Sequence, residues 1–136
     1  MAGYSGTPLI KKLGIKEGMR VVVLHALARY AQILGRLPAG AVLESGLYKS
    51  AALIHYFTKN KSALARDFPE LKTALLPDGA LWISWPEAAS KVPTDLSDQV
   101  VREIGIENGL VDVKVAAIDE TRSGLKFVYR VKDRKK

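Results

Sequence analysis

The distribution of apolar and polar residues changes along the chain and predicts two kinds of strand. The first 86 residues contain continuous apolar runs that are bounded by turn residues. Such runs are typical of parallel strands that are buried on both faces. They predict strands near residues 20–25, 41–44, 51–57 and 79–85.

Between these runs, apolar residues recur at the three- and four-residue spacing of amphipathic helices. This spacing predicts helices near residues 8–13, 28–37, 60–76 and 96–104. Thr7 is expected to cap the first helix, with Pro8 at its first position. Because proline lacks an N–H group, we expect the third helix to break at Phe68–Pro69. We expect Gly105 to end the fourth helix.

In the last third of the chain, apolar and polar positions alternate. Valines at positions 111, 113 and 115 alternate with polar residues, and a second alternating segment runs from Leu125 to Val131. This pattern is typical of strands with one face on the core and the other toward solvent. The connection ETRSG is short, so strands near 109–118 and 124–132 are expected to form an antiparallel hairpin.

Together these elements predict a three-layer, Rossmann-like α/β fold. Its sheet is expected to have about six strands, mostly parallel, with the C-terminal antiparallel hairpin at one edge. The 136 residues contain no internal repeat or low-complexity linker, so we expect a single domain over residues 1–136.

Composition excludes several kinds of protein. The absence of cysteine excludes a disulfide framework and thiolate metal sites. The first residues lack the pattern of a signal peptide, and no apolar run approaches the roughly 18 residues of a membrane span. We therefore expect a cytoplasmic protein that does not act in a membrane.

The net charge of +7 is concentrated toward the ends of the sequence. Residues 1–20 carry +3 and residues 122–136 carry +6, which leaves −2 for residues 21–121. No stripe of basic residues is interleaved with aromatic ones, so nucleic acid is not expected as the main partner. Any such binding is expected to be weak, salt-sensitive and carried by residues 132–136.

Two segments resemble class I S-adenosylmethionine-dependent methyltransferases. IKEGMRVVVL is similar to the entry into their first strand, and LKTALLPDGALWISW is similar to a later helix-turn-strand segment. The closing hairpin is similar to the final strand pair of that fold. One helix and one strand after AVLES are missing. The resemblance implies a truncated methyltransferase-like Rossmann fold.

A second resemblance spans nearly the whole chain. The segments that carry it are GYSGTPLIKKLGIK, PDGALWISWP, VPTDLSDQVVRE and GLVDVKVAAIDETRSGLKFVYR. Together they resemble a family of small bacterial proteins that is classed as a domain of unknown function. This resemblance implies the same truncated fold and no established activity.

The methyltransferase resemblance places a cofactor over a glycine-rich turn after the first strand. In this sequence His25, Leu27 and Arg29 stand at the glycine positions, and each is expected to add a side chain over the cofactor's path. Glu44, at the end of the second predicted strand, is the acid expected to hold a ribose. We therefore expect no cofactor, and at most weak binding of S-adenosylmethionine.

Ligands of open α/β sheets bind at the carboxyl ends of the parallel strands. The side chains expected at this edge are His25, Glu44, Tyr56, Trp85, Thr94 and Asp95. In one interpretation, Trp85 walls a pocket with polar groups from Thr94 and His25. In the other, Trp85 packs in the core, and Thr94 or Asp95 caps the helix that follows.

No motif in the sequence predicts catalysis or a metal site. His25 and His55 are the only histidines, and no acidic cluster accompanies them at ligand spacing. The function expected first is a non-catalytic module that binds a small molecule or a protein partner. The alternatives are a methyltransferase with an unconventional cofactor site and a nucleic-acid accessory protein that uses the basic ends. Ligand, partner and oligomeric state stay open.

Overall fold

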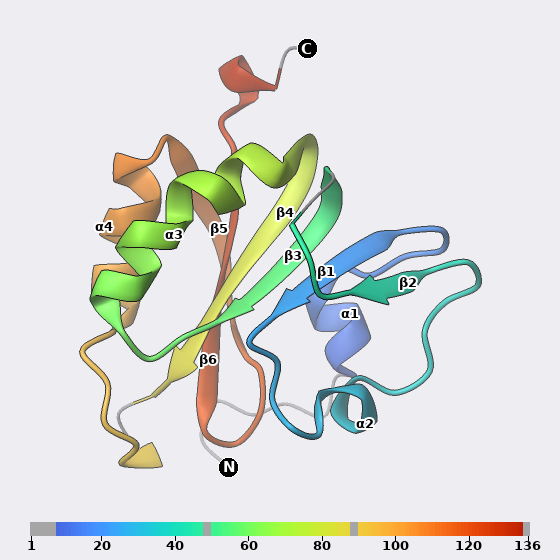
Figure 1. Ribbon diagram of the computed structural model, residues 1–136, viewed down its shortest axis with the longest axis horizontal. Helices are drawn as coiled ribbons and strands as arrows, with labels where there is room; N and C mark the ends of the chain where they lie inside the picture. The colour runs from blue at the N-terminus through green and yellow to red at the C-terminus, as the bar shows by residue number, and fades with distance from the viewer. Residues whose placement is uncertain (1–7, 48–49, 88–89, 135–136) are drawn as a thin grey trace.

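The computed structural model describes residues 8–47, 50–87 and 90–134. A six-stranded sheet with helices on both faces forms the centre of the molecule (Figure 1). Its order is β2-β1-β3-β4-β6-β5, with parallel pairing from β2 to β4 and antiparallel pairing from β4 to β5. The strands are β1 (Arg20–Leu24), β2 (Val42–Glu44), β3 (Ala51–Phe57), β4 (Leu75–Pro86), β5 (Leu110–Ala117) and β6 (Arg122–Tyr129). The predicted fold class and hairpin are confirmed.

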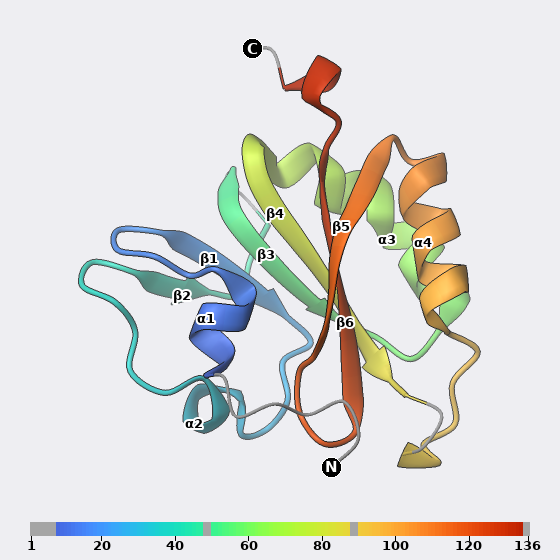
Figure 2. The same ribbon diagram turned by 180° about the vertical axis from the view of Figure 1, so that it is seen from behind.

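The sheet separates the core into two layers, one on each of its faces, and helices cover both faces (Figures 1 and 2). α3 (Lys61–Ala74) and α4 (Asp98–Glu107) cover one face, where Phe68, Trp85 and Phe127 are buried. α1 (Leu9–Leu13) and α2 (Tyr30–Leu34) cover part of the other face, where Trp82 is buried. No helix in the described residues is long and apolar enough to cross a membrane.

The first and third helices differ from prediction at their prolines. Pro8 occupies the N-cap position of α1, and the predicted cap Thr7 lies outside the described residues. The break predicted at Phe68–Pro69 is wrong, because α3 continues through Pro69. Pro69 has no N–H group to donate to the carbonyl oxygen of Ala65, one turn earlier in the helix. Both residues are exposed, so water can bind that carbonyl oxygen. Burial of Phe68 holds the helix on the sheet.

Gly105 lies inside α4, so the prediction that it ends the helix is wrong. The helix continues to Glu107 and is capped by Asn108. A Cβ atom at position 105 would lie 2.0 Å from Cε1 of Phe127. The glycine therefore permits α4 to pack closely against β6.

The alternation predicted for the strand near 109–118 is broken by a β-bulge in β5. Asp112 pairs with Phe127 and Lys114 pairs with Lys126, which leaves Val113 as the extra residue. Val113 is 55% exposed and Val115 is 57% exposed. Their predicted burial is wrong, since the bulge changes the face that each side chain takes and β5 lies at the sheet edge.

Candidate functional site

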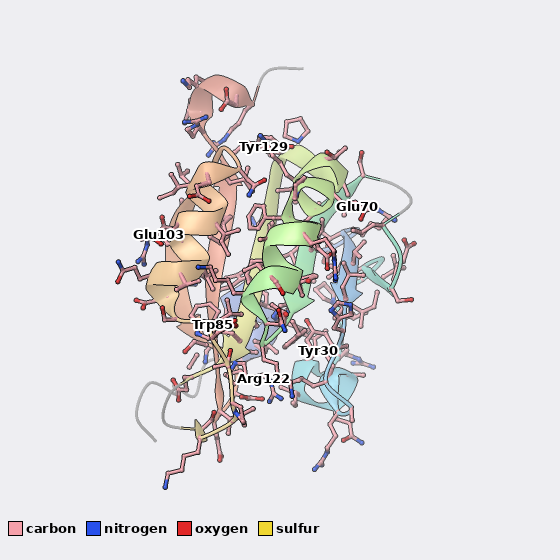
Figure 3. The ribbon with its side chains drawn as sticks, turned by 60° about the vertical axis from the view of Figure 1, so that its left-hand side comes forward. Tyr30, Glu70, Trp85, Glu103, Arg122 and Tyr129 are labelled. Atoms are coloured by element: carbon pink, nitrogen blue, oxygen red, sulfur yellow. The ribbon has the colours of Figure 1, made fainter. Side chains whose placement is uncertain are left out.

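The carboxyl ends of the parallel strands lie at one edge of the sheet, where the described residues line three pockets. Figure 3 shows Tyr30, Trp85 and Arg122, from α2, β4 and β6, at this end of the molecule. We name the pockets the β1–β2 pocket, the middle pocket and the Trp85 pocket. Their volumes are about 580, 220 and 540 Å³ respectively.

The β1–β2 pocket lies where the methyltransferase resemblance places the cofactor. Its walls include Val23, Leu27, Tyr30 and Glu44, with small residues of the turn after β1. Of the three residues at glycine positions, Leu27 lines this pocket. His25 instead lines the middle pocket. The Nε atom of Arg29 donates to the side-chain oxygen of Gln32.

The turn after β1 keeps one glycine-like feature. The backbone of His25 has a φ of 57°, in the left-handed region that non-glycine residues rarely adopt. Its Nδ1 donates to the carbonyl oxygen of Phe57 over 3.1 Å, and its ring lies 5.2 Å from the ring of Tyr56. Packing and this hydrogen bond hold the strained conformation.

Glu44 is engaged by a neighbouring cation. Its Oε1 accepts a hydrogen bond from Nε of Arg20, while Nη1 of the same guanidinium donates to the carbonyl oxygen of Ser50 over 2.7 Å. The carboxylate expected to hold a ribose is thus directed into an ion pair. With Leu27 in place of glycine as well, the residues of this pocket fit S-adenosylmethionine poorly.

A buried chain of three polar side chains links two of the pockets. The hydroxyl oxygen of Tyr30 lies 2.8 Å from Nδ1 of His55, and the hydroxyl oxygen of Ser84 lies 2.6 Å from Nε2. Tyr30 also lines the β1–β2 pocket, and Ser84 lines the middle pocket. The prediction missed this chain because its members lie on α2, β3 and β4 without any sequence spacing that relates them.

The electrostatics of this chain follow from its burial. His55 and Ser84 are fully buried. Burial lowers the pKa of His55 to about 3 and raises the pKa of Tyr30. The imidazole is therefore neutral near pH 7, so one of its nitrogens donates a hydrogen bond and the other accepts one.

Tyr56 lies near the carboxyl end of β3, lines none of the three pockets and packs in the core. Its buried hydroxyl donates to Oδ2 of Asp67 over 2.6 Å. Burial and this hydrogen bond raise the pKa of Tyr56. The pKa of Asp67 is lowered by hydrogen bonds from Arg66 and Tyr56. The phenol is therefore protonated and held at neutral pH.

The Trp85 pocket combines an apolar wall with polar groups. Trp85 is 3% exposed, so it packs in the core and presents only an edge to the pocket. The pocket's apolar residues are Trp85, Val92, Pro93, Leu96 and Val115. Its polar residues are Glu87, Lys91, Thr94, Ser97, Asp98 and Ser123. The sequence grouped Trp85 with Thr94 and His25; the structure brings Trp85 and Thr94 together and places His25 in the middle pocket.

The expected capping role of Thr94 or Asp95 is wrong. Ser97 caps α4, since its Oγ accepts from the N–H of Val100 over 3.2 Å. Oδ1 of Asp95 instead accepts from the N–H of Lys61, the first residue of α3, over 2.7 Å. Thr94 donates to the carbonyl oxygen of Lys59 over 2.8 Å. The loop before α4 therefore caps a different helix, whose start lies 34 residues earlier.

The described residues contain no group of three or more histidine, aspartate or glutamate side chains that could hold a metal ion. The pockets can supply hydrogen bonds, apolar contact, carboxylate charge and, from Lys59, Lys91 and Arg122, positive charge. Ser84 lines the middle pocket but, like His55, has 0% exposure, so its side chain offers no solvent-accessible surface to a substrate there.

Comparisons with known proteins agree on the fold. No protein-family model and no curated protein matches this sequence. A SAM-dependent methyltransferase from Aquifex aeolicus is similar in structure, with a TM-score of 0.60 and 17% identity over 88% of this chain and 86% of that chain. Magnesium protoporphyrin IX methyltransferase from Synechocystis PCC 6803 gives a TM-score of 0.53 and 8% identity over 90% and 78%. The B. subtilis M1A22 tRNA methyltransferase TrmK gives 0.56 and 12% over 97% and 68%.

These identities are low, so the likeness extends to the fold alone. The chain has the class I S-adenosylmethionine-dependent methyltransferase-like Rossmann fold.

Proposed function

We propose that this protein is a non-catalytic module that binds a small molecule in the Trp85 pocket. The observation that carries the proposal is the convergence of an apolar wall and several polar side chains at the carboxyl edge. On the resemblance stated above, we also infer that the chain belongs with the small bacterial proteins classed as a domain of unknown function.

The side chains of the pocket define the chemistry of the ligand. Glu87 and Asp98 bring two carboxylates, and Lys91 brings one ammonium group. Oε2 of Glu87 already accepts from the hydroxyl of Ser123 over 3.2 Å, which orients the carboxylate. Lys91 has a φ of 63°, a strained conformation of the kind that collects at binding loops. A ligand with an apolar body and a cationic or hydroxyl-bearing head would suit these groups.

Burial of the reactive side chains supports a non-catalytic role. Ser84 and His55 form a close pair, yet both have 0% exposure. A nucleophile must contact the reacting atom of its substrate. In the Trp85 pocket the hydroxyl of Ser123 donates to Oε2 of Glu87, and the described lining includes no histidine that could serve as a base.

Binding of S-adenosylmethionine is a second candidate, and one observation favours it. The β1–β2 pocket has about 580 Å³ at the cofactor position, and in the turn after β1 the backbone of His25 follows a glycine-like path. The ion pair of Glu44 and the side chain of Leu27 oppose it.

Mass spectrometry of the purified protein tests the proposal through two valine variants on β5. Val115 lines the Trp85 pocket, whereas Val113 is equally exposed and does not line it. Val115→Trp should fill the pocket and remove a co-purifying small molecule, while Val113→Trp should retain it.

Retention of the molecule by Val115→Trp would contradict the proposal. Calorimetry with S-adenosylmethionine distinguishes the second candidate from the proposal. If the second candidate is right, the measured affinity should be low-micromolar, roughly −8 kcal/mol. That affinity, retained in Val115→Trp, would assign the function to the β1–β2 pocket.

A further inference from the structure

Three lysines that are distant in the sequence gather on the face of the sheet that carries α1. Lys16 follows α1, Lys114 lies on β5 and Lys126 lies on β6. We call them the lysine triad. In Figure 2, α1 lies beside β5 and β6, and no helix of the described residues covers these two strands on this face.

The strand register places two members of the triad directly opposite each other. Lys114 and Lys126 are partners in the antiparallel pairing of β5 and β6. Side chains at such positions have Cβ atoms roughly 5 Å apart, and like charges there are destabilising. Nζ of Lys114 reaches the carbonyl oxygen of Lys12 at 3.5 Å, so the end of α1 meets the pair.

The described residues leave the triad without a neutralising carboxylate. None of the ion pairs formed within them includes Lys16, Lys114 or Lys126. The remaining residues contain no aspartate or glutamate. Burial lowers the pKa of Lys126, and the charges of Lys114 and Lys16 lower it further. The three groups thus repel one another.

The shape of the surface favours an extended partner over a small anion. None of the three pockets described above is lined by a member of the triad. β6 leads directly from Lys126 to Arg130 and the basic segment after it, at the end of the molecule marked C in Figure 2. The basic surface therefore follows a strand rather than enclosing a site.

We propose that the lysine triad is a docking surface for nucleic acid, which it holds by contacts to backbone phosphates. A polyanion that lies across β5 and β6 would relieve the repulsion within the triad. Lysine suits this role because its ammonium group acts as a point charge toward phosphate. The expected binding depends on charge and carries little sequence preference, since no aromatic side chain accompanies the three lysines on these strands' shared face.

The lysine triad differs from the nucleic-acid-binding segment that the net charge along the sequence predicts. The charge of +6 on residues 122–136 predicts binding through residues 132–136. The triad draws on three separate segments, and Lys114 lies in the part of the sequence whose net charge is negative. The pairing of β5 with β6 brings Lys114 and Lys126 together and so creates a local excess of positive charge.

Fluorescence anisotropy with a labelled DNA duplex and a labelled single-stranded RNA, each of about 20 nucleotides per strand, tests the proposal. At about 50 mM salt the full chain should bind with a Kd on the order of 10 µM. Lys114→Gln/Lys126→Gln should weaken binding about tenfold and should reduce the slope of log K against log salt by about 2.

A charge-matched variant controls for net charge. Arg36→Gln/Lys61→Gln also removes two positive charges, from exposed side chains outside the triad, and should bind within about twofold of the unchanged chain. Lys114→Gln/Lys126→Gln should melt no lower than the unchanged chain, because it removes a cross-strand repulsion.

Three results would overturn the proposal. The first is absence of binding at about 50 mM salt, or equal affinity of Lys114→Gln/Lys126→Gln and the unchanged chain. The second is loss of binding only on deletion of residues 132–136. The third is equally effective competition by polyglutamate of matched charge, which would assign the surface to an acidic protein.

Discussion

At the scale of single residues, side chains in the loop before α4 form hydrogen bonds that hold two elements together. Asp95 accepts the first N–H of α3, while Thr94 donates to the carbonyl oxygen of Lys59 just before that helix. Asn60 caps the same helix through the N–H of Ala63. Two acceptors, one local and one distant, therefore satisfy N–H groups that the helix cannot pair internally.

Substitution of Asp95 should distinguish a hydrogen-bond acceptor from a required charge. Asp95→Ala should reduce the free energy of unfolding by about 1 kcal/mol, because it removes the acceptor for Lys61 N–H. Asp95→Asn should be nearly neutral, since its amide oxygen can accept the same bond. Urea titration measures both changes, with Thr94→Ala in the same series.

The exposed Glu120 supplies a control for loss of an acidic side chain. Glu120→Ala should change stability by less than about 0.5 kcal/mol. Equal stability of Asp95→Ala and the unchanged chain would contradict the capping role. Loss of ligand in Asp95→Asn without loss of stability would show instead that the carboxylate binds the ligand.

At the scale of elements, the contact between α4 and β6 depends on the missing side chain of Gly105. Alanine usually stabilises a helix interior by about 0.5–1 kcal/mol relative to glycine. Here the added methyl group would overlap the ring of Phe127. Gly105→Ala should therefore destabilise the protein by about 1–3 kcal/mol.

Urea titration of Gly105→Ala measures this cost, with the exposed Glu107→Ala on the same helix as a control. The double variant Gly105→Ala/Phe127→Leu should lose less stability than the sum of its single variants, since the smaller side chain relieves the overlap. A stabilised Gly105→Ala would show that the helix does not pack this closely on β6.

Strands that are identified by their own residue composition could be predicted from the sequence. The apolar runs of β1, β3 and β4 are buried by helices on both faces, so their composition alone identifies them. The bulge at Val113 could not be predicted, because it arises from pairing with β6. Continuity of α3 through Pro69 could not be predicted either, since it depends on packing of the helix against the sheet.

The same distinction applies to the candidate site. Topology places His25, Glu44 and Trp85 at the carboxyl edge, so their positions could be predicted from strand ends. Their contacts could not be predicted, since the partners of Glu44 and Asp95 lie 24 and 34 residues away in sequence. The role of Glu87 could not be predicted although it follows β4 directly, because the Ser123 hydroxyl that contacts it lies 36 residues away on β6.

At the scale of the whole molecule, His55 should make stability depend on pH. Its folded-state pKa of about 3 lies below the ordinary value of 6.5. Its contribution is complete above pH 6.5 and declines toward pH 3, because over this range only the unfolded chain binds the proton. At about pH 5 the expected loss is about 2 kcal/mol.

Urea unfolding between pH 7 and 4, roughly, with His55→Gln as the comparison, checks this expectation. The variant should be less stable at neutral pH but should lack this component of the pH dependence. Imidazole NMR signals of His55 should show no titration above about pH 4. Protonation near pH 6.5 in the folded protein would contradict the neutral, buried assignment.

The bulge in β5 has a consequence for how the molecule behaves among its own copies. β5 and β2 are the two outer strands of the sheet, and outer strands offer unpaired backbone groups to other chains. β2 has only three residues, whereas β5 has eight and exposes Val113 and Val115. Bulges and lysines are two devices that hinder intermolecular strand pairing. Val113 forms the bulge and Lys114 is the lysine, and both lie on β5, the longer of the two outer strands. They should therefore reduce aggregation through this strand.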